Sequence, residues 1–134
     1  MIGRLRSWLA SRWVRSKYER VIPHKLHRAI DEADRLIVRH HVPDGSVLFE
    51  SGDRSDFDKL KESLAVVEFP VTGFEHCMCL GEEAIHLYRV GKQTVQLTNH
   101  HGTSVRCNLW GSDARIVHQE KWLAWLTQHV NVGR

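Results

Sequence analysis

The sequence lacks the features that define several large classes of protein. No stretch approaches the run of about 18 apolar residues that indicates a membrane-spanning helix. The apolar run near the N-terminus is short and interrupted by arginines, unlike the central region of a secretory signal. Three cysteines are present, an odd number that does not fit a disulfide-rich secreted domain. We therefore expect a cytoplasmic protein whose thiols are reduced.

Common site motifs are missing as well. The chain has no Cys-x-x-Cys pair of a zinc ribbon and no glycine-rich loop of the kind that holds phosphate groups. Residues 52–56 contain oxygen ligands, but they lack the spacing and the final glutamate of a calcium-binding loop. No single motif therefore specifies an activity.

Charge is unevenly distributed along a chain of ordinary globular composition. The 134 residues are 42% hydrophobic and 26% charged, which suits one domain with one core. Residues 1–41 contain ten lysines and arginines against four acidic residues, whereas residues 42–134 contain nine against twelve. We expect a basic helical extension over residues 1–42 and an α+β domain over residues 43–134.

The extension begins with a predicted amphipathic helix over residues 2–20, in which apolar residues recur at helical spacing from Ile2 to Trp13. In the simplest interpretation this helix docks its apolar stripe on the core and leaves its arginines in solvent. Alternatively, residues 1–22 bind another protein, a membrane surface or nucleic acid. The candidate partner-binding residues are Arg4, Arg6, Trp8, Arg12, Trp13 and Arg15.

A second helix is predicted over residues 24–41, directly after Pro23. Its apolar positions from Leu26 to Ile37 fall on one face. His40 and His41 would lie at its C-terminal end, where the helix dipole favours cations. The turn Pro43-Asp44-Gly45 then separates the extension from the domain.

The remaining residues predict a mixture of strands and helices. Between residues 74 and 108 apolar and polar residues alternate, as in an antiparallel meander. Short strands are expected over 46–50 and 65–69, and helices over 55–65 and 118–130. We therefore predict a mostly antiparallel sheet of about five or six strands, with both helices on one face.

The first predicted hairpin joins strands 84–90 and 94–100. Directly opposed residues in antiparallel strands share a face, so the apolar residues constrain the loop. A three-residue loop from Gly91 to Gln93 would place Leu87 opposite Leu97. The outer face would then carry His86, Tyr88, Thr98 and His100, with the two histidines diagonal to each other.

The second predicted hairpin has a three-residue loop from His101 to Thr103. This loop places Leu97 opposite Cys107 and Asn99 opposite Val105. Gly102 would supply the positive φ that such loops need. We therefore predict that Cys107 is a core residue.

The segment His76-Cys77-Met78-Cys79-Leu80-Gly81 concentrates side chains that bind metals or act as nucleophiles. If the loop to the next strand is Gly81 to Glu83, both thiols are paired with Leu87 and Ile85 and are buried. If the loop is Gly81 to Ala84, Cys79 faces His86 and Cys77 faces Tyr88. The alternation of residues does not decide between the two registers.

Three functional hypotheses follow. The first is a small binding or regulatory module, either with zinc held through Cys77, Cys79, His86 and His100 or without a metal, in which case these residues only fill the sheet. The second is a cysteine-dependent enzyme or redox protein, in which Cys79 is activated by His86 or His100. The third is an interaction protein that acts through the basic N-terminal helix. Further candidate site residues are His76, Tyr88, Asn99, His101 and Gly102.

Several of these motifs together resemble a group of small, uncharacterised bacterial proteins. The shared pattern is Cys77-Met78-Cys79-Leu80-Gly81, then Leu87-Tyr88, then His100-His101-Gly102 and Trp110-x-Ser112-Asp113-Ala114. The resemblance covers residues 45–130, roughly, and leaves the basic extension outside. It implies no established activity and no catalytic residues, but it favours the placement of the cysteine and histidine motifs in one site.

Overall fold

The computed structural model describes residues 20–41, 45–70, 81–110 and 112–130. Within these residues, three helices accompany a seven-stranded sheet in which every neighbouring pair of strands is antiparallel. The predicted α+β fold with a mostly antiparallel sheet is confirmed. None of the helices in the described ranges is long and apolar enough to cross a membrane.

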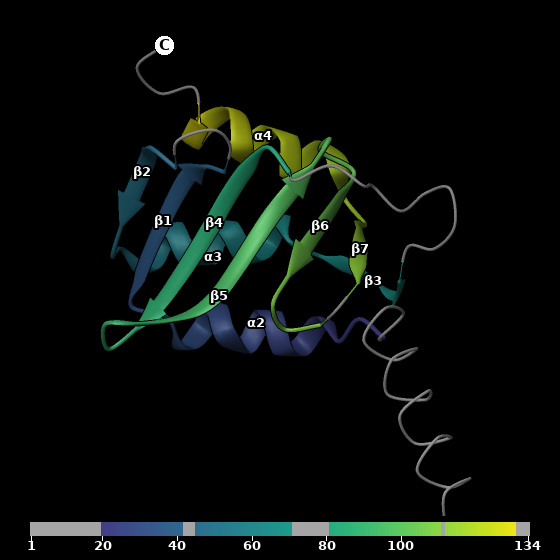
Figure 1. The fold of residues 1–134 in the computed structure, drawn as a ribbon, viewed down its shortest axis with the longest axis horizontal. Coiled ribbons are helices and arrows are strands. Elements are labelled where there is room, and N and C mark those ends of the chain that lie inside the picture. The colour runs from purple at the N-terminus through teal and green to yellow at the C-terminus, as the bar shows by residue number, and fades with distance from the viewer. Residues whose placement is uncertain (1–19, 42–44, 71–80, 111, 131–134) are drawn as a thin grey trace, which may run out of the picture.

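The strands follow the spatial order β2-β1-β4-β5-β6-β7-β3 (Figure 1). The strands are β1 (Arg35–His40), β2 (Val47–Ser51), β3 (Val66–Pro70), β4 (Glu83–Arg89), β5 (Lys92–His100), β6 (Ser104–Cys107) and β7 (Asp113–Ile116). The helices are α2 (Pro23–Glu32), α3 (Arg54–Ser63) and α4 (Gln119–Val130).

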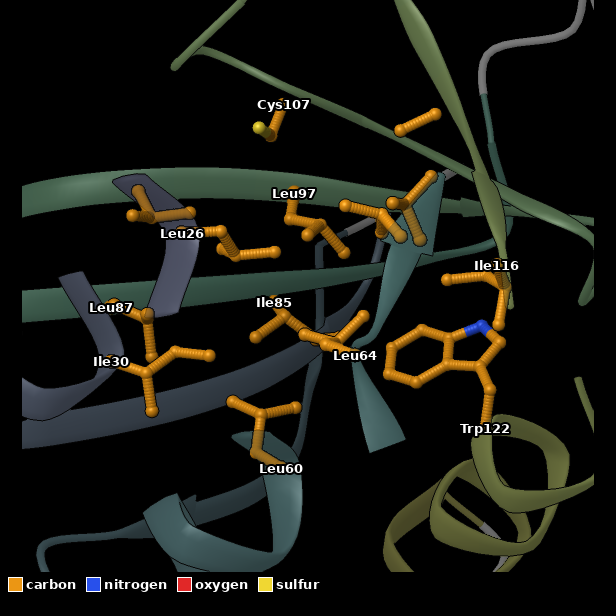
Figure 2. Packing of buried hydrophobic residues seen from close by; sticks show 14 of the residues in the cluster. Leu26, Ile30, Leu60, Leu64, Ile85, Leu87, Leu97, Cys107, Ile116 and Trp122 are labelled. Atoms are coloured by element: carbon orange, nitrogen blue, oxygen red, sulfur yellow. The ribbon is translucent and has the colours of Figure 1, made fainter. Parts of the chain in front are cut away.

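All three helices lie against one face of the sheet (Figure 1). Alternate strand residues point to this face and bury their apolar side chains against the helices. Figure 2 shows Leu26 and Ile30 of α2, Leu60 of α3 and Trp122 of α4 packed around the strand residues Ile85, Leu87 and Leu97. The predicted helices 55–65 and 118–130 are therefore confirmed in place, and α2 joins them in the same layer.

The predicted helix over residues 24–41 is wrong in its second half, because α2 ends at Glu32 and β1 begins at Arg35. Leu36, Ile37 and Val38 are all buried, so their apolar run belongs to a strand covered on both faces. β1 pairs with β2 on one side and with β4 on the other. The sheet and its core thus include residues on both sides of the boundary predicted between residues 42 and 43.

The predicted loop from Gly91 to Gln93 is also wrong. The β4–β5 turn consists of Val90 and Gly91, both with positive φ, as in a two-residue type I′ hairpin. At the register shift between Leu87 and Tyr88, β5 contains one extra residue, Thr94, so that Tyr88 lies opposite Gln93 and Leu87 lies opposite Val95. The apolar residues still face the core. However, each β4 residue from Ala84 to Leu87 lies opposite a β5 residue two positions earlier than predicted.

The β5–β6 hairpin has the predicted register. Leu97 lies opposite Cys107 and Asn99 lies opposite Val105, which leaves the three-residue loop His101 to Thr103. Gly102 has φ +72°, and a Cβ atom there would lie 2.6 Å from Cδ2 of Leu123 in α4. Glycine is therefore required both by the backbone conformation and by the close approach of α4.

Candidate functional site

The face of the sheet that points away from the helices carries polar side chains that are buried. We call it the open face, and its positions follow from the strand register. Ala84, Thr98, Arg106 and Asp113 are opposed in one row across four strands, and His100 is opposed to Ser104 in the next row. The side chains of Thr98, His100, Ser104 and Asp113 are 7%, 0%, 6% and 0% exposed.

His100 and Thr98 form a buried hydrogen-bonded pair on β5. Nε2 of His100 lies 2.9 Å from Oγ1 of Thr98. Burial, followed by the positive charge of Arg106, lowers the pKa of His100, although Asp113 and Glu82 act in the opposite direction. His100 is therefore neutral at neutral pH, and its imidazole can accept or donate a hydrogen bond within the site.

Gly81 lies directly beside this pair. Its φ is +94°, and a Cβ atom on it would lie 2.8 Å from Cβ of Thr98 and 3.3 Å from Nε2 of His100. A side chain at this position would collide with the pair in a backbone conformation that already disfavours it. The glycine that ends the Cys-Met-Cys-Leu-Gly motif is therefore explained by its packing against the open face.

Arg106 and Asp113 form a two-point ion pair between β6 and β7. Nε of Arg106 lies 2.5 Å from Oδ1 of Asp113, and Nη2 lies 3.0 Å from Oδ2. The Asp113 side chain is fully buried, whereas the Arg106 side chain is 34% exposed. The pair fixes the plane of the guanidinium group at the surface of the open face.

A pocket of about 280 Å³ opens beside Arg106. Asn108 shapes its wall, because its Oδ1 accepts a hydrogen bond from the Gln96 backbone N–H at 2.9 Å and its Nδ2 donates to the Thr94 carbonyl at 3.1 Å. These bonds hold the segment after β6 against β5. The pocket is lined by His41, Gln96, Thr98, Arg106, Cys107 and Asn108.

The Cys107 thiol takes no part in this polar chemistry, because its side chain belongs to the hydrophobic core (Figure 2). Burial raises the pKa of the Cys107 thiol to about 12, so that it stays protonated. The prediction that Cys107 is a core residue is confirmed. A protonated, buried thiol is a poor nucleophile and a poor metal ligand.

The two histidines of the predicted zinc site are far apart. His86 lies opposite Gln96, and His100 is four residues further along β5, a separation of roughly 13 Å along the strand. The prediction that they lie diagonally to each other is therefore wrong. No group of three or more metal-ligating side chains occurs within the ranges that the structure describes.

The cysteine half of the predicted site, Cys77 and Cys79, lies outside the described residues, as does His76. The structure does bear on the strand that they were expected to join. From Ala84 to Tyr88, one edge of β4 is hydrogen-bonded to β1 and the other to β5. Neither of the two predicted hairpin registers against β4 is therefore available to the cysteines.

Asn99 is directed to the helix side of the sheet and has a structural role. Its Nδ2 donates to Oε1 of Glu83 at 3.0 Å, while its Oδ1 accepts from the Gly102 N–H at 3.1 Å and from Nε1 of Trp122 at 2.9 Å. These bonds tie the His101–Thr103 loop to β4 and α4. Asn99 thus positions the loop beyond His100 and is not exposed to a ligand.

The remaining candidate residues are dispersed. His101 is exposed at the loop, where its Nδ1 lies 3.2 Å from Oε1 of Glu82. Tyr88 lies at the opposite end of β4, against Gln93 near the turn. The six candidate partner-binding residues from Arg4 to Arg15 fall outside the described part of the chain.

Sequence reasoning missed Gln96, Arg106, Asn108 and Asp113. The missed signal is a pair of opposite charges, Arg106 and Asp113, on either side of the turn at Trp110, where a hairpin would oppose them. Comparisons with protein-family models, with curated proteins and with solved structures find no match to this chain. The function must therefore be inferred from the geometry of the open face.

Proposed function

We propose that this chain is a small binding module whose ligand occupies the pocket on the open face of the sheet. The observation that supports this proposal is the burial of His100, Thr98 and Asp113, the last paired with Arg106, on the face opposite the helices. An antiparallel sheet commonly leaves its second face to solvent, with exposed polar side chains. Here the polar side chains are buried and joined to one another beside a pocket.

The energetics of these groups favour a role in binding over a role in stability. Removing an ion pair from water costs about as much free energy as the attraction between its charges provides. Apolar residues of similar volume are therefore often equally or more stabilising. A sheet face that served stability alone would therefore be expected to carry apolar residues at positions 106 and 113. The polar groups suit the recognition of a ligand, because they are held in fixed orientations.

The groups that line the pocket define the kind of ligand. Gln96 offers an amide that both donates and accepts, and Arg106 offers N–H groups in a plane fixed by Asp113. A volume of about 280 Å³ accommodates a small polar molecule or one polar end of a larger one. The proposed module thus recognises a small polar group.

The experiment blocks the pocket with a bulky side chain. Gln96 is exposed and lines the pocket, so Gln96→Trp fills it without disturbing the core. Gln93→Trp is the matched control, because Gln93 is an exposed residue of the same strand outside the pocket. A panel of small polar compounds, including acetate, inorganic phosphate and acetamide, is titrated while NMR follows the side-chain amides of Gln96 and Asn108.

We expect at least one compound to shift the Asn108 amide signals in the wild-type protein and in Gln93→Trp, and to have no such effect in Gln96→Trp. Equal shifts in both variants would place binding elsewhere and overturn the proposal. The absence of any shift at Gln96 and Asn108 across the panel would also overturn it.

The zinc and thiol hypotheses stay predictions and have a separate test. Metal analysis of the purified protein is compared with that of Cys77→Ser and Cys79→Ser variants. One zinc ion per chain that is lost in both variants would support the metal-binding hypothesis. A thiol that is alkylated unusually fast at neutral pH, without metal, would support the cysteine-dependent hypothesis. Slow alkylation without metal would contradict both.

A further inference from the structure

An uncompensated positive charge lies on the open face next to the pocket. Arg39 of β1 is half-buried, and its Nη1 donates to the Gly45 carbonyl at 3.1 Å, a neutral partner. Within the described part of the chain no carboxylate pairs with Arg39, whereas Arg35 pairs with Glu50 and Arg106 with Asp113. A half-buried cation without a counter-charge favours the approach of an anion.

His86 of β4 adds a hydrogen-bonding group without a partner. Its Nε2 is shielded from solvent and has no hydrogen-bond partner among the described residues. Most buried polar atoms in folded proteins have a partner, so an unpaired nitrogen on the face that carries the pocket is available to a bound group.

The strand register brings these groups together. Arg39 lies opposite Ala84 and Ile37 lies opposite His86, so Arg39 and His86 are diagonal neighbours on one face. Diagonal neighbours are roughly 7 Å apart at the backbone, which long side chains span. His41, the residue directly after β1, also lines the pocket. The side chain of Ala84 is only a methyl group, so β4 leaves space between Arg39 and Thr98.

The electrostatic field at His86 agrees with this geometry. Burial lowers the pKa of His86 most, and the charges of Arg39 and then His41 lower it further. Within the described ranges, the charges that shift the pKa of His86 are those of Arg39 and His41, whereas at His100 the carboxylates of Asp113 and Glu82 act against the cations. The part of the open face between β1 and β4 is therefore electropositive.

We propose that Arg39, His41 and His86 form an oxyanion-binding site that receives a carboxylate or phosphate group of the ligand in the adjacent pocket. This inference rests on the proposed function and names the chemical class of the ligand. The Arg39 guanidinium neutralises the oxyanion and His86 Nε2 donates or accepts one hydrogen bond, according to its tautomer and the protonation of the ligand. Gln96 and Arg106 contact the rest of the ligand.

The test compares charged and neutral probes of similar size. Inorganic phosphate, acetate and acetamide are each titrated into the full chain in a phosphate-free buffer, with NMR detection at His86 and Gln96. We expect phosphate and acetate to shift both residues and acetamide to bind at least tenfold more weakly. Tighter binding of phosphate would indicate phosphate esters as ligands, and tighter binding of acetate would indicate carboxylic acids; both results support the inference.

Two substitutions test whether the anion binds at the proposed site. Arg39→Gln and His86→Gln are each expected to weaken anion binding about tenfold, since each removes one interaction with the anion. Lys59→Gln removes the same charge from the exposed side of α3 and is expected to leave anion binding unchanged. Circular dichroism verifies folding, and His86→Gln, which keeps the charge of Arg39, provides the test if Arg39→Gln fails to fold.

Three results would overturn the inference, and they differ from failure of the proposed function. If acetamide bound as tightly as the anions, the ligand would not need to be anionic, but the pocket would remain a binding site. If Lys59→Gln weakened anion binding as much as Arg39→Gln does, the net charge of the protein would explain the effect. Unchanged anion binding in both site variants would place the anion elsewhere. If none of the three probes shifts Gln96, the proposed function fails together with the inference.

Discussion

The two faces of the sheet are built from the same strands but are held together by different interactions. On the helix face, residues such as Leu87, Leu97 and Trp122 are buried in a continuous apolar core. On the open face, His100, Thr98 and Asp113 are equally buried but interact through hydrogen bonds and charge. Alternation along a strand thus lets one element serve both stability and recognition. The difference predicts that substitutions on the two faces will change different measured properties.

The largest loss of stability is expected from Trp122→Ala on the helix face. The Trp122 side chain is fully buried, stacks on Trp125 with ring centres 5.6 Å apart and donates to Asn99. Its removal leaves a cavity and should lower the free energy of unfolding by about 4 kcal/mol in urea denaturation. Gln96→Ala on the open face should change it by less than about 0.5 kcal/mol. Similar losses in the two variants would abolish the proposed division between the faces.

The next effect separates binding from stability within the open face. Asp113→Leu leaves Arg106 without its carboxylate partner and should cost about 3 kcal/mol of unfolding free energy. Adding Arg106→Met to form the double variant should restore stability to within about 1 kcal/mol of the wild type, while binding of pocket ligands is lost. A double variant as unstable as Asp113→Leu would show that the pair is needed for the fold itself.

A smaller effect concerns pH and also belongs to the open face. Burial and neighbouring cations hold the pKa values of His86 and His100 below the ordinary value of 6.5. At pH below 6.5 the unfolded chain therefore binds more protons than the folded one, and stability decreases as the pH falls through and below this value.

Urea denaturation at about pH 7.5 and about pH 5.5 measures this loss. The combined His86→Gln and His100→Gln variant should show a smaller difference between the two pH values than the wild type. The matched control is His24→Gln, since His24 lies on α2 away from the open face. A pH dependence that is the same in all three proteins would assign the effect to other groups.

The smallest effect is expected at a residue that belongs to neither face. Val90 is 84% exposed and has φ +50°, a conformation that a β-branched residue adopts at a cost. Val90→Asn should raise the free energy of unfolding by about 0.5 to 1 kcal/mol, because asparagine tolerates this conformation. The backbone N–H of residue 90 keeps its hydrogen bond to Asp34. Val117→Asn controls for the loss of an exposed valine, and equal effects would rule out the backbone explanation.

Local patterns predicted the parts of the fold that depend on local pairing. The β5–β6 register followed from Leu97, Cys107 and the glycine at position 102, because alternation and turn chemistry agree there. At β4–β5 the same reasoning failed, because one extra residue on β5, Thr94, restores the alternation and cannot be recognised from it. The shift of two positions is what separates His86 from His100.

Pairing between distant segments could not be predicted in this way. The run Leu36-Ile37-Val38 continues the apolar pattern of α2, and only the presence of β2 and β4 on both sides makes it a strand. The same pairing occupies the edge of β4 that the cysteine strand was expected to use. For the site, the histidines were correctly assigned to the open face, whereas the Arg106–Asp113 pair depends on β7, a strand that the sequence pattern did not indicate.

The position of β1 between β2 and β4 has a consequence for how the chain can be shortened and synthesised. A chain that started at residue 43 would lack β1, so β2 would have no partner and β4 would expose an unpaired edge to other molecules. During translation the β1–β2 hairpin is complete long before β4 leaves the ribosome, and α2 and α3 are the elements available to shield Leu36 and Val38 in the meantime. The pairing of β4 with β1 therefore comes later, and it is this pairing that brings Arg39 and His86 together on the open face.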